Sequence, residues 1–471
     1  MQNVNIGAHC RIRFSRFLSL NNKYHGRTLL CRADYQGRPI PGRISFSADA
    51  VTVKLVGFEH FVHFEHGDTV LLQLEDNCYC TAIADPTSPG INQTATDLCH
   101  SVKFDVSQAI IGFRPWKEAD RVQEFYFRLS DVNGVLEAPD IRRMITATKV
   151  SEHSNSKIIE ACSGDATITI SYRLSFGWPD DFYKVDDFHG CIRFTSAKTV
   201  EEISEYVALI RTFFTMAAGV TVSTKDYWLV PDSNHEQPML GGGVALAPFQ
   251  LLWSGGEHHL SRVPKTSKPT SVLRSWTIED REAVSKCLAF WMDNWNKWKP
   301  AFQALFLATY AGNTFDTDRV INACKWLETT PGTEAQKLGI EGELKKITEV
   351  AQSKAKELGL NLDRRIAFAI EKLNSESRRD VVKRLIDIGV AVGDEKLKKR
   401  FRSDVNKALD FRNRFAHDTF DHENNEDFGN YVRCTMAVEA LAFLLLYKSL
   451  PLPADHHWGH GPNNFTEYLF L

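Results

Sequence analysis

The sequence lacks the features that would place the protein in a membrane or outside the cell. Residues 1–13 contain no apolar core of the kind found in a signal peptide. The longest apolar run near the end, 437–447, is interrupted by Glu439 and is shorter than the roughly 20 residues that cross a bilayer. The 10 cysteines have no framework spacing, which favours reduced thiols. We therefore expect a cytoplasmic protein without a membrane segment.

Common catalytic and phosphate-binding motifs are also missing. The chain contains no G-x-S-x-G, no H-E-x-x-H and no glycine-rich loop that ends in Lys-Ser or Lys-Thr. The formal net charge of -3 means that any nucleic-acid site must come from a local excess of basic residues. No metal or other cofactor is predicted. Four residues leave the question of a metal open, although their spacing matches no common zinc pattern: Cys78, Cys80, Cys99 and His100.

The first half of the chain has the alternating pattern of short β-strands. Turn signals such as Asn133-Gly134 separate the alternating runs. One helix is predicted over 197–218, because its apolar residues recur every three to four positions. We expect a sandwich or barrel-like region of mostly antiparallel strands. The clearest strand candidates are 51–55, 70–74, 102–106, 125–129 and 166–176.

From Ser275 onward the hydrophobic period becomes helical. The last predicted helix is apolar on most faces, which is typical of the central helix of a bundle. The predicted fold class is therefore α+β, with a β-rich domain over 1–240, a linker over 241–274 and an all-α bundle over 275–471. The predicted helices after the linker include 316–329, 340–357, 362–374, 378–392, 395–417 and 428–450.

Polar and charged side chains gather at the end of the predicted helix 395–417. Basic residues outnumber acidic ones between residues 371 and 420. An arginine guanidinium matches phosphate geometry, and a histidine acts as general base or acid near neutral pH. Basic residues near a helix C-terminus also interact favourably with the helix dipole, which is a purely structural explanation. The residues concerned are Arg412, Asn413, Arg414, His417 and Asp418.

Arginine and histidine together suffice for attack of a ribose 2′-hydroxyl on the adjacent phosphodiester. The products would be a 2′,3′-cyclic phosphate and a 5′-hydroxyl, and DNA could not react by this route. Arg412 and His417 are five residues apart, about 140° out of phase on a straight helix. They can cooperate only if the helix end is distorted or a two-fold partner completes the site.

Three segments resemble known families. Arg412-Asn413-x-x-x-His417 resembles the Arg-x4-His signature of HEPN ribonucleases, and it likewise precedes a loop and a very apolar last helix. Residues 38–46 and 51–57 are similar to the opening β-hairpins of ApeA-type anti-phage proteins, which join a β-rich N-terminal region to a C-terminal HEPN bundle. Residues 320–328 are similar to the first HEPN helix of that group, in which an acidic residue follows an apolar pair.

The resemblance implies a catalytic site made of Arg412, His417 and Asn413, with supporting roles for Glu328, Arg414 and Asp418. One departure concerns Glu328, because 329–332 breaks the helix where that group has a longer basic helix.

As a whole, the resemblance implies a dimeric, metal-independent endoribonuclease of abortive-infection type. Its partners would be RNA, with transfer RNA among the candidates, a second copy joined through the HEPN domain, and a phage protein sensed by the N-terminal domain. The alternative is a non-catalytic dimerisation module that binds RNA or protein, with the β-rich half as the working part.

Overall fold

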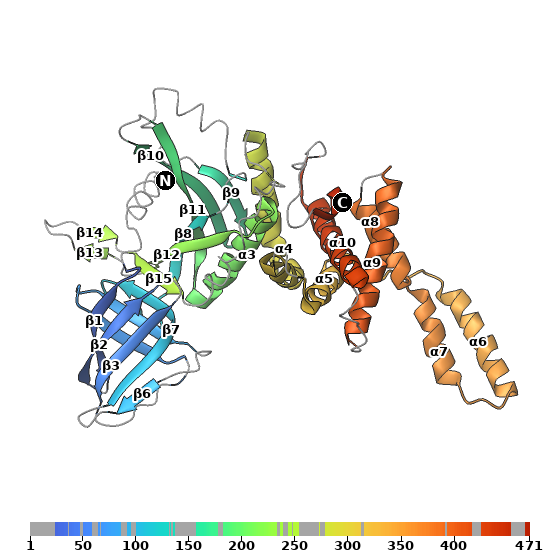
Figure 1. Cartoon of the computed structure of the whole chain (residues 1–471), viewed down its shortest axis with the longest axis horizontal. Helices are drawn as coiled ribbons and strands as arrows, with labels where there is room; N and C mark the ends of the chain where they lie inside the picture. Colours follow the sequence, from blue (N-terminus) through green and yellow to red (C-terminus); the bar gives the residue numbers. More distant parts are fainter. Residues whose placement is uncertain are drawn as a thin grey trace, which may run out of the picture. The chain divides into compact units, whose positions relative to one another are not determined.

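The computed structural model shows an antiparallel β-rich region followed by a helical one, which confirms the predicted α+β class (Figure 1). Two compact units are present, one formed by Met1–Thr266, Ser271–Asp293 and Leu452–Trp458, the other by Ser267–Thr270, Asn294–Pro451 and Gly459–Leu471. The residues that the structure describes are 24–35, 37–47, 50–58, 65, 67–85, 92–95, 100–130, 132, 135–136, 157–177, 182–232, 236–238, 244–246, 248–253, 273, 278–311, 315–390, 393–416, 425–453 and 467–471.

The β-rich unit is built on one 13-stranded sheet whose described pairings are all antiparallel. The strands follow the order β3-β2-β1-β4-β5-β7-β15-β12-β8-β11-β10-β9, with β6 paired to β7. Their bounds are β1 (Thr28–Tyr35), β2 (Arg38–Phe46), β3 (Val51–Phe58), β4 (Thr69–Leu74), β5 (Tyr79–Ala84), β6 (Asn92–Ala95), β7 (His100–Gly112), β8 (Val122–Ser130), β9 (Lys157–Ser163), β10 (Ala166–Gly177), β11 (Phe182–Lys198), β12 (Ser223–Pro231) and β15 (Phe249–Trp253).

The first strands close into a barrel because β3 also pairs with β7. Strict alternation marks the inner face: in β4 every second residue, Val70, Leu72 and Leu74, is buried, and the residues between them are exposed. Closure leaves no unpaired edge among β1 to β5 and β7. The inward side chains of these strands form one hydrophobic core.

Helix α3 (Val200–Ala218) belongs to the β-rich unit. It starts three residues later than predicted, because β11 continues to Lys198 and Thr199 caps the helix. The Thr199 hydroxyl accepts from the backbone N–H of Glu202, whose carboxylate accepts from the backbone N–H of Thr199. This reciprocal capping box fixes the helix start.

The predicted linker 241–274 contains a strand of the main sheet. Strand β15 pairs with β7 and β12, so this part of the range belongs to the β-rich unit. Strands β13 (Glu236–Pro238) and β14 (Val244–Leu246) pair only with one another among the described strands. Segments of three to five residues are too short for a clear alternation, which explains why they were not predicted.

The helical unit is organised around α10 (Asn425–Ser449), which packs against α5 (Thr317–Thr329), α8 (Arg378–Gly389) and α9 (Glu395–Ala416) (Figure 1). Residues from Ala440 to Tyr447 are buried without interruption, as expected for a central helix. The other helices are α4 (Ile278–Ala311), which starts in the β-rich unit, α6 (Glu341–Glu357), α7 (Asp363–Glu371), η3 (Lys372–Asn374) and α11 (Glu467–Phe470).

Helix α10 is longer than its apolar run suggests. Among the described residues it is the one helix long and apolar enough to cross a membrane, over the 22 residues Phe428–Ser449. The predicted apolar run, 437–447, is therefore only part of a longer helix that meets this criterion by length and composition. Its most apolar part is 72% buried within the protein, as expected for the core helix of a bundle.

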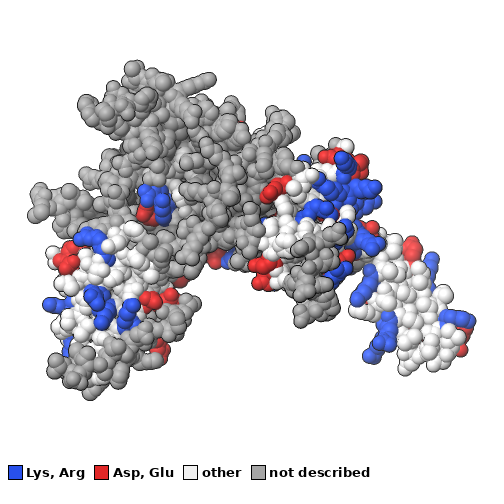
Figure 2. All heavy atoms as spheres, viewed as in Figure 1, with Lys and Arg blue, Asp and Glu red and all other residues white. Residues whose placement is uncertain are grey.

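Helices α6 and α7 form a hairpin that projects away from the bundle (Figure 1). Large apolar side chains on it are exposed, among them Val350, Leu358 and Phe368. Figure 2 shows mainly uncharged atoms along this hairpin, with lysine and arginine side chains toward its margins.

A buried ion pair fixes α5 against α10. Arg319 Nε lies 2.8 Å from Glu439 Oε1, and Arg319 Nη2 lies 3.0 Å from Glu439 Oε2. The two side chains are only 6% and 3% exposed. The Arg319 guanidinium also lies 3.9 Å from the centre of the Phe315 ring.

We expect Arg319→Ala to destabilise the helical unit by about 3–5 kcal/mol, because the Glu439 carboxylate would remain buried without its partner. Hydrogen exchange of the α10 amides, followed by mass spectrometry, measures the effect. Lys354→Ala removes an exposed ion pair with Glu357. It should change the opening free energy obtained from hydrogen exchange by less than about 1 kcal/mol. Equal exchange in Arg319→Ala and wild type would contradict a stabilising role for the buried pair.

A second prediction concerns Gly190, which pairs with Phe127 across β11 and β8. A Cβ at Gly190 would lie 1.9 Å from Phe127 Cζ. We expect Gly190→Ala to destabilise the β-rich unit by about 1–3 kcal/mol, because the ring must leave its site. Calorimetry should show a lower melting transition. Gly342→Ala, where the Cβ meets nothing within 4 Å, is the control and should not lower the transition.

Candidate active site in the helical unit

The apolar stripe of α9 ends in an arginine. Phe401, Val405 and Ala408 are fully buried and recur every three to four residues, and Arg412 is the next position of the same series. Its side chain is 31% exposed. An arginine that only complemented the helix dipole could lie on the solvent face, as the exposed Lys407 does. Arg412 instead continues the core-facing side of α9.

Arg412 is held there by Glu328. Its Nη1 atom forms an ion pair with Glu328 Oε1, and Glu328 is the second-last residue of α5. The pair therefore joins the end of α5 to the last turns of α9, although the two residues lie 84 positions apart in the sequence. Glu328 is 46% exposed, so the pair contributes little to stability. Its main physical effect is to draw the guanidinium toward the end of α5.

A buried thiol lies beneath the pair. Cys324 lies one turn before Glu328, and its Sγ is 4.0 Å from the backbone oxygen of Ala408. Burial raises the pKa of Cys324 to about 12, against an opposing effect of the Arg412 charge. The thiol therefore stays neutral at physiological pH and is not a thiolate nucleophile.

Aromatic rings fasten the end of α9 to the start of α10. The Tyr431 ring lies edge-on to Phe411 and Phe415, with centroids 5.9 Å and 5.6 Å away. The Tyr431 hydroxyl donates to the backbone oxygen of Asp316, which precedes α5. Burial raises the pKa of Tyr431 to about 12, so it remains protonated. Tyr431 thus joins the last turns of α9 to the start of α5.

Two further predicted residues, Asn413 and Arg414, do not gather with Arg412. Asn413 and Arg414 are exposed. Arg414 follows Arg412 by about 200° around the helix and lies 5.8 Å from the Phe411 ring. Helix α9 ends at Ala416, and His417 and Asp418 lie outside the described residues. Their roles therefore stay predictions.

The described candidate metal ligands, Cys78, Cys80 and His100, lie in the barrel region. Cys80 is fully buried in the core, and burial raises the pKa of its thiol. Cys78 precedes β5, His100 opens β7, and Cys99 lies outside the described residues. In the part of the chain that the structure describes, no three metal-ligating side chains come together.

Comparison with known proteins identifies the β-rich half. Residues 23–291 match the family model of the ApeA N-terminal domain 1. No curated protein and no solved structure matches the chain. The matched range covers more than half of the sequence and includes the barrel, the rest of the sheet, α3 and the first part of α4. The chain therefore belongs to the family of ApeA-like anti-phage defence proteins.

Proposed function

We propose that this protein is a metal-independent endoribonuclease whose helical unit cuts RNA during phage infection. The observation that carries the proposal is the placement of Arg412, five positions before His417 in the sequence, on the core-facing side of α9, where it pairs with Glu328. The anti-phage family of the N-terminal region supports a role in defence. We place the protein in the cytoplasm, where its RNA substrate would be.

The proposed reaction needs a base, an acid and a cation. His417 takes the proton of a ribose 2′-hydroxyl, and the 2′-oxygen attacks the adjacent phosphorus. Arg412 donates hydrogen bonds to the phosphate oxygens, on which negative charge develops. The bond from phosphorus to the 5′-oxygen breaks, and that oxygen takes up a proton. The products are a 2′,3′-cyclic phosphate and a 5′-hydroxyl.

A second copy of the chain would complete the site. A single Arg412 and His417 supply one base, whereas the leaving oxygen also needs an acid. In a two-fold dimer formed through the helical unit, a second His417 could act as that acid. Three further residues have proposed supporting roles. The exposed side chains of Asn413 and Arg414 would donate hydrogen bonds to RNA, and Asp418 would supply a carboxylate next to His417 in the sequence. The N-terminal unit is the proposed sensor of a phage protein.

We expect Arg412→Ala and His417→Ala to reduce RNA cleavage at least about 100-fold, because each removes a group that acts in the transition state. Cleavage is measured on RNA from phage-infected cells that produce each variant, and hydrogen exchange of α9 and α10 reports folding. Lys354→Ala, on the projecting hairpin, is the control and should cleave as wild type.

Cleavage that persists in both variants would contradict the proposal. A non-catalytic binding module gives a different pattern: His417→Ala would bind RNA normally, whereas loss of basic side chains would weaken binding in a salt-dependent way. The ion pair between Arg412 and Glu328, which could serve structure alone, makes this comparison necessary.

The chemical identity of the product ends gives an independent prediction. RNA should carry 2′,3′-cyclic phosphate and 5′-hydroxyl ends, and cleavage should persist in EDTA because Arg412 and His417 supply the proposed chemistry. Replacing the ribose at the cut site by deoxyribose should abolish cleavage. Ends that carry a 5′-phosphate, or inhibition by EDTA, would contradict the mechanism.

A further inference from the structure

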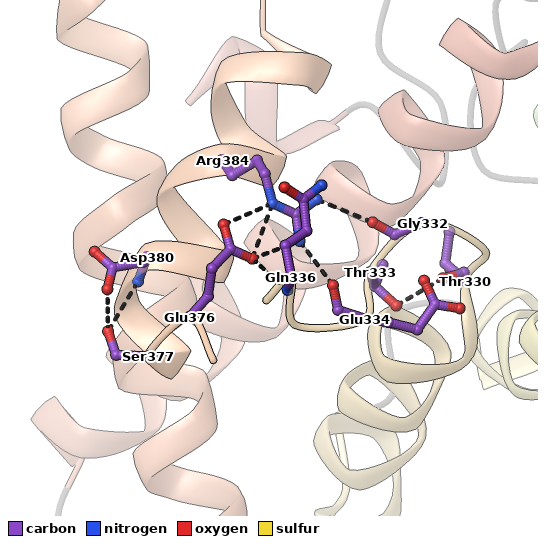
Figure 3. Close-up of polar contacts among 9 residues, drawn as sticks. All are labelled: Thr330, Gly332, Thr333, Glu334, Gln336, Glu376, Ser377, Asp380 and Arg384. Atoms are coloured by element: carbon purple, nitrogen blue, oxygen red, sulfur yellow. Dashed lines mark hydrogen bonds and ion pairs between the residues drawn. The ribbon is translucent and has the colours of Figure 1, made fainter. Parts of the chain in front are cut away.

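Two connecting segments of the helical unit are clamped together by one arginine (Figure 3). Arg384 of α8 bonds to both oxygens of Glu376, with Nε 3.0 Å from Oε1 and Nη2 2.9 Å from Oε2. The same guanidinium donates to the backbone oxygens of Gly332, at 3.1 Å, and Glu334, at 2.8 Å. These bonds tie the segment after α5 to α8.

Glu376 completes the clamp on the other side. Its Oε2 accepts from the backbone N–H of Gln336 at 3.0 Å, and its own N–H donates to the Gln336 carbonyl at 2.9 Å. The hydrogen bond from Arg384 lowers the pKa of Glu376, so the carboxylate stays charged. The side chains of Arg384 and Glu376 are mostly buried, at 19% and 12% exposed. Residues 332–336 are therefore held firmly.

This clamped segment reaches back to Glu328 through a buried hydroxyl. Thr333 Oγ1 lies 3.1 Å from the backbone oxygen of Glu328 and 2.6 Å from that of Thr330. Thr330 in turn donates its hydroxyl to the backbone oxygen of Trp326 at 2.8 Å. The Trp326 oxygen also accepts from the Thr330 backbone N–H, whereas the Thr333 hydroxyl supplies a donor to the Glu328 carbonyl at the end of α5. The helix thus ends at Thr329, one residue after Glu328.

We infer that Arg384 and Thr333 are positioning residues for the candidate active site: they fix Glu328, and Glu328 fixes the Arg412 guanidinium. This inference rests on the proposed ribonuclease function. A half-exposed ion pair between two helix ends does not by itself hold a guanidinium in one orientation, because both side chains have many rotamers. Anchoring the backbone of one partner removes much of that freedom, as precise catalysis requires.

A different role for the contacts among Arg384, Glu376 and residues 332–336 is to hold the α6–α7 hairpin, because the chain enters and leaves the hairpin at these contacts. Leu338 N donates to the Asn374 oxygen at 2.7 Å, and Asn374 Nδ2 donates to Glu341 Oε1 at 2.8 Å. A purely architectural clamp would not act through Glu328. The experiment must therefore measure the coupling to Glu328, and not stability alone.

The test uses the full chain isolated from phage-infected cells and a mixed-sequence fluorescent oligoribonucleotide. We expect Thr333→Val to lower kcat about tenfold with KM changed less than about twofold, because a misplaced Arg412 weakens transition-state binding alone. Thr333→Ser keeps the hydroxyl and should therefore retain the wild-type kcat. Arg384→Gln should also lower kcat, because it releases Gly332 and Glu334.

The coupling is measured in a Glu328→Gln background, in which the ion pair is already lost. Thr333→Val should then change kcat less than about twofold, since its effect passes through Glu328. Thr348→Val is the matched control: it removes a similar bond, from Thr348 Oγ1 to the Leu344 oxygen at 2.8 Å, within α6. It should retain wild-type kcat.

Each outcome separates the two proposals. If Arg412→Ala is inactive but Thr333→Val and Arg384→Gln cleave as wild type, the positioning role is wrong and the ribonuclease proposal stands. If Thr333→Val lowers kcat by the same factor in the Glu328→Gln background as in the wild type, the two effects are independent. The clamp is then only structural, and the inference fails. If the wild-type chain does not cut the oligoribonucleotide, or Arg412→Ala cuts it equally well, the proposed function itself is overturned.

Discussion

The burial of α10 is the constraint on which the helical unit depends. This helix is packed by α5, α8 and α9, and the buried ion pair between Arg319 and Glu439 fixes how α5 lies along it. A buried pair of charges tolerates little displacement, because either charge alone would be costly to bury. Helices α5 and α9 are thereby held so that their C-terminal ends lie together, and Arg412 forms an ion pair with Glu328 there.

The abrupt end of α5 acquires a physical role in this arrangement. The break after Glu328 looks like a defect when compared with the longer helix of the resembling family. In the structure, Thr330 and Thr333 donate to carbonyl groups at the end of α5, and Arg384 holds the segment that follows. A helix that stops in a defined geometry presents its last carboxylate in a defined place. The defined end of α5 is what the proposed supporting role of Glu328 requires.

The β-rich unit solves a different problem. Closing β1 to β5 and β7 into a barrel removes edges that could pair with other chains. The long strand β7 also pairs with β15, so one strand belongs to both the barrel and the rest of the sheet. The family match covers this whole arrangement, which links the defence role to the β-rich half. Its proposed partner is a phage protein, and the helical unit is the proposed effector.

The sequence by itself determined the local elements, because burial on one face imposes a period of two on strands and of 3.6 on helices. It also singled out Arg412 and its neighbours from their chemistry, and Glu328 from a family resemblance. Only the tertiary structure decided that Arg412 extends the stripe of Ala408 toward Glu328, that β15 belongs to the sheet, and that Arg384 clamps residues 332–336. These contacts join segments far apart in the chain, and no local period records which distant segments will meet.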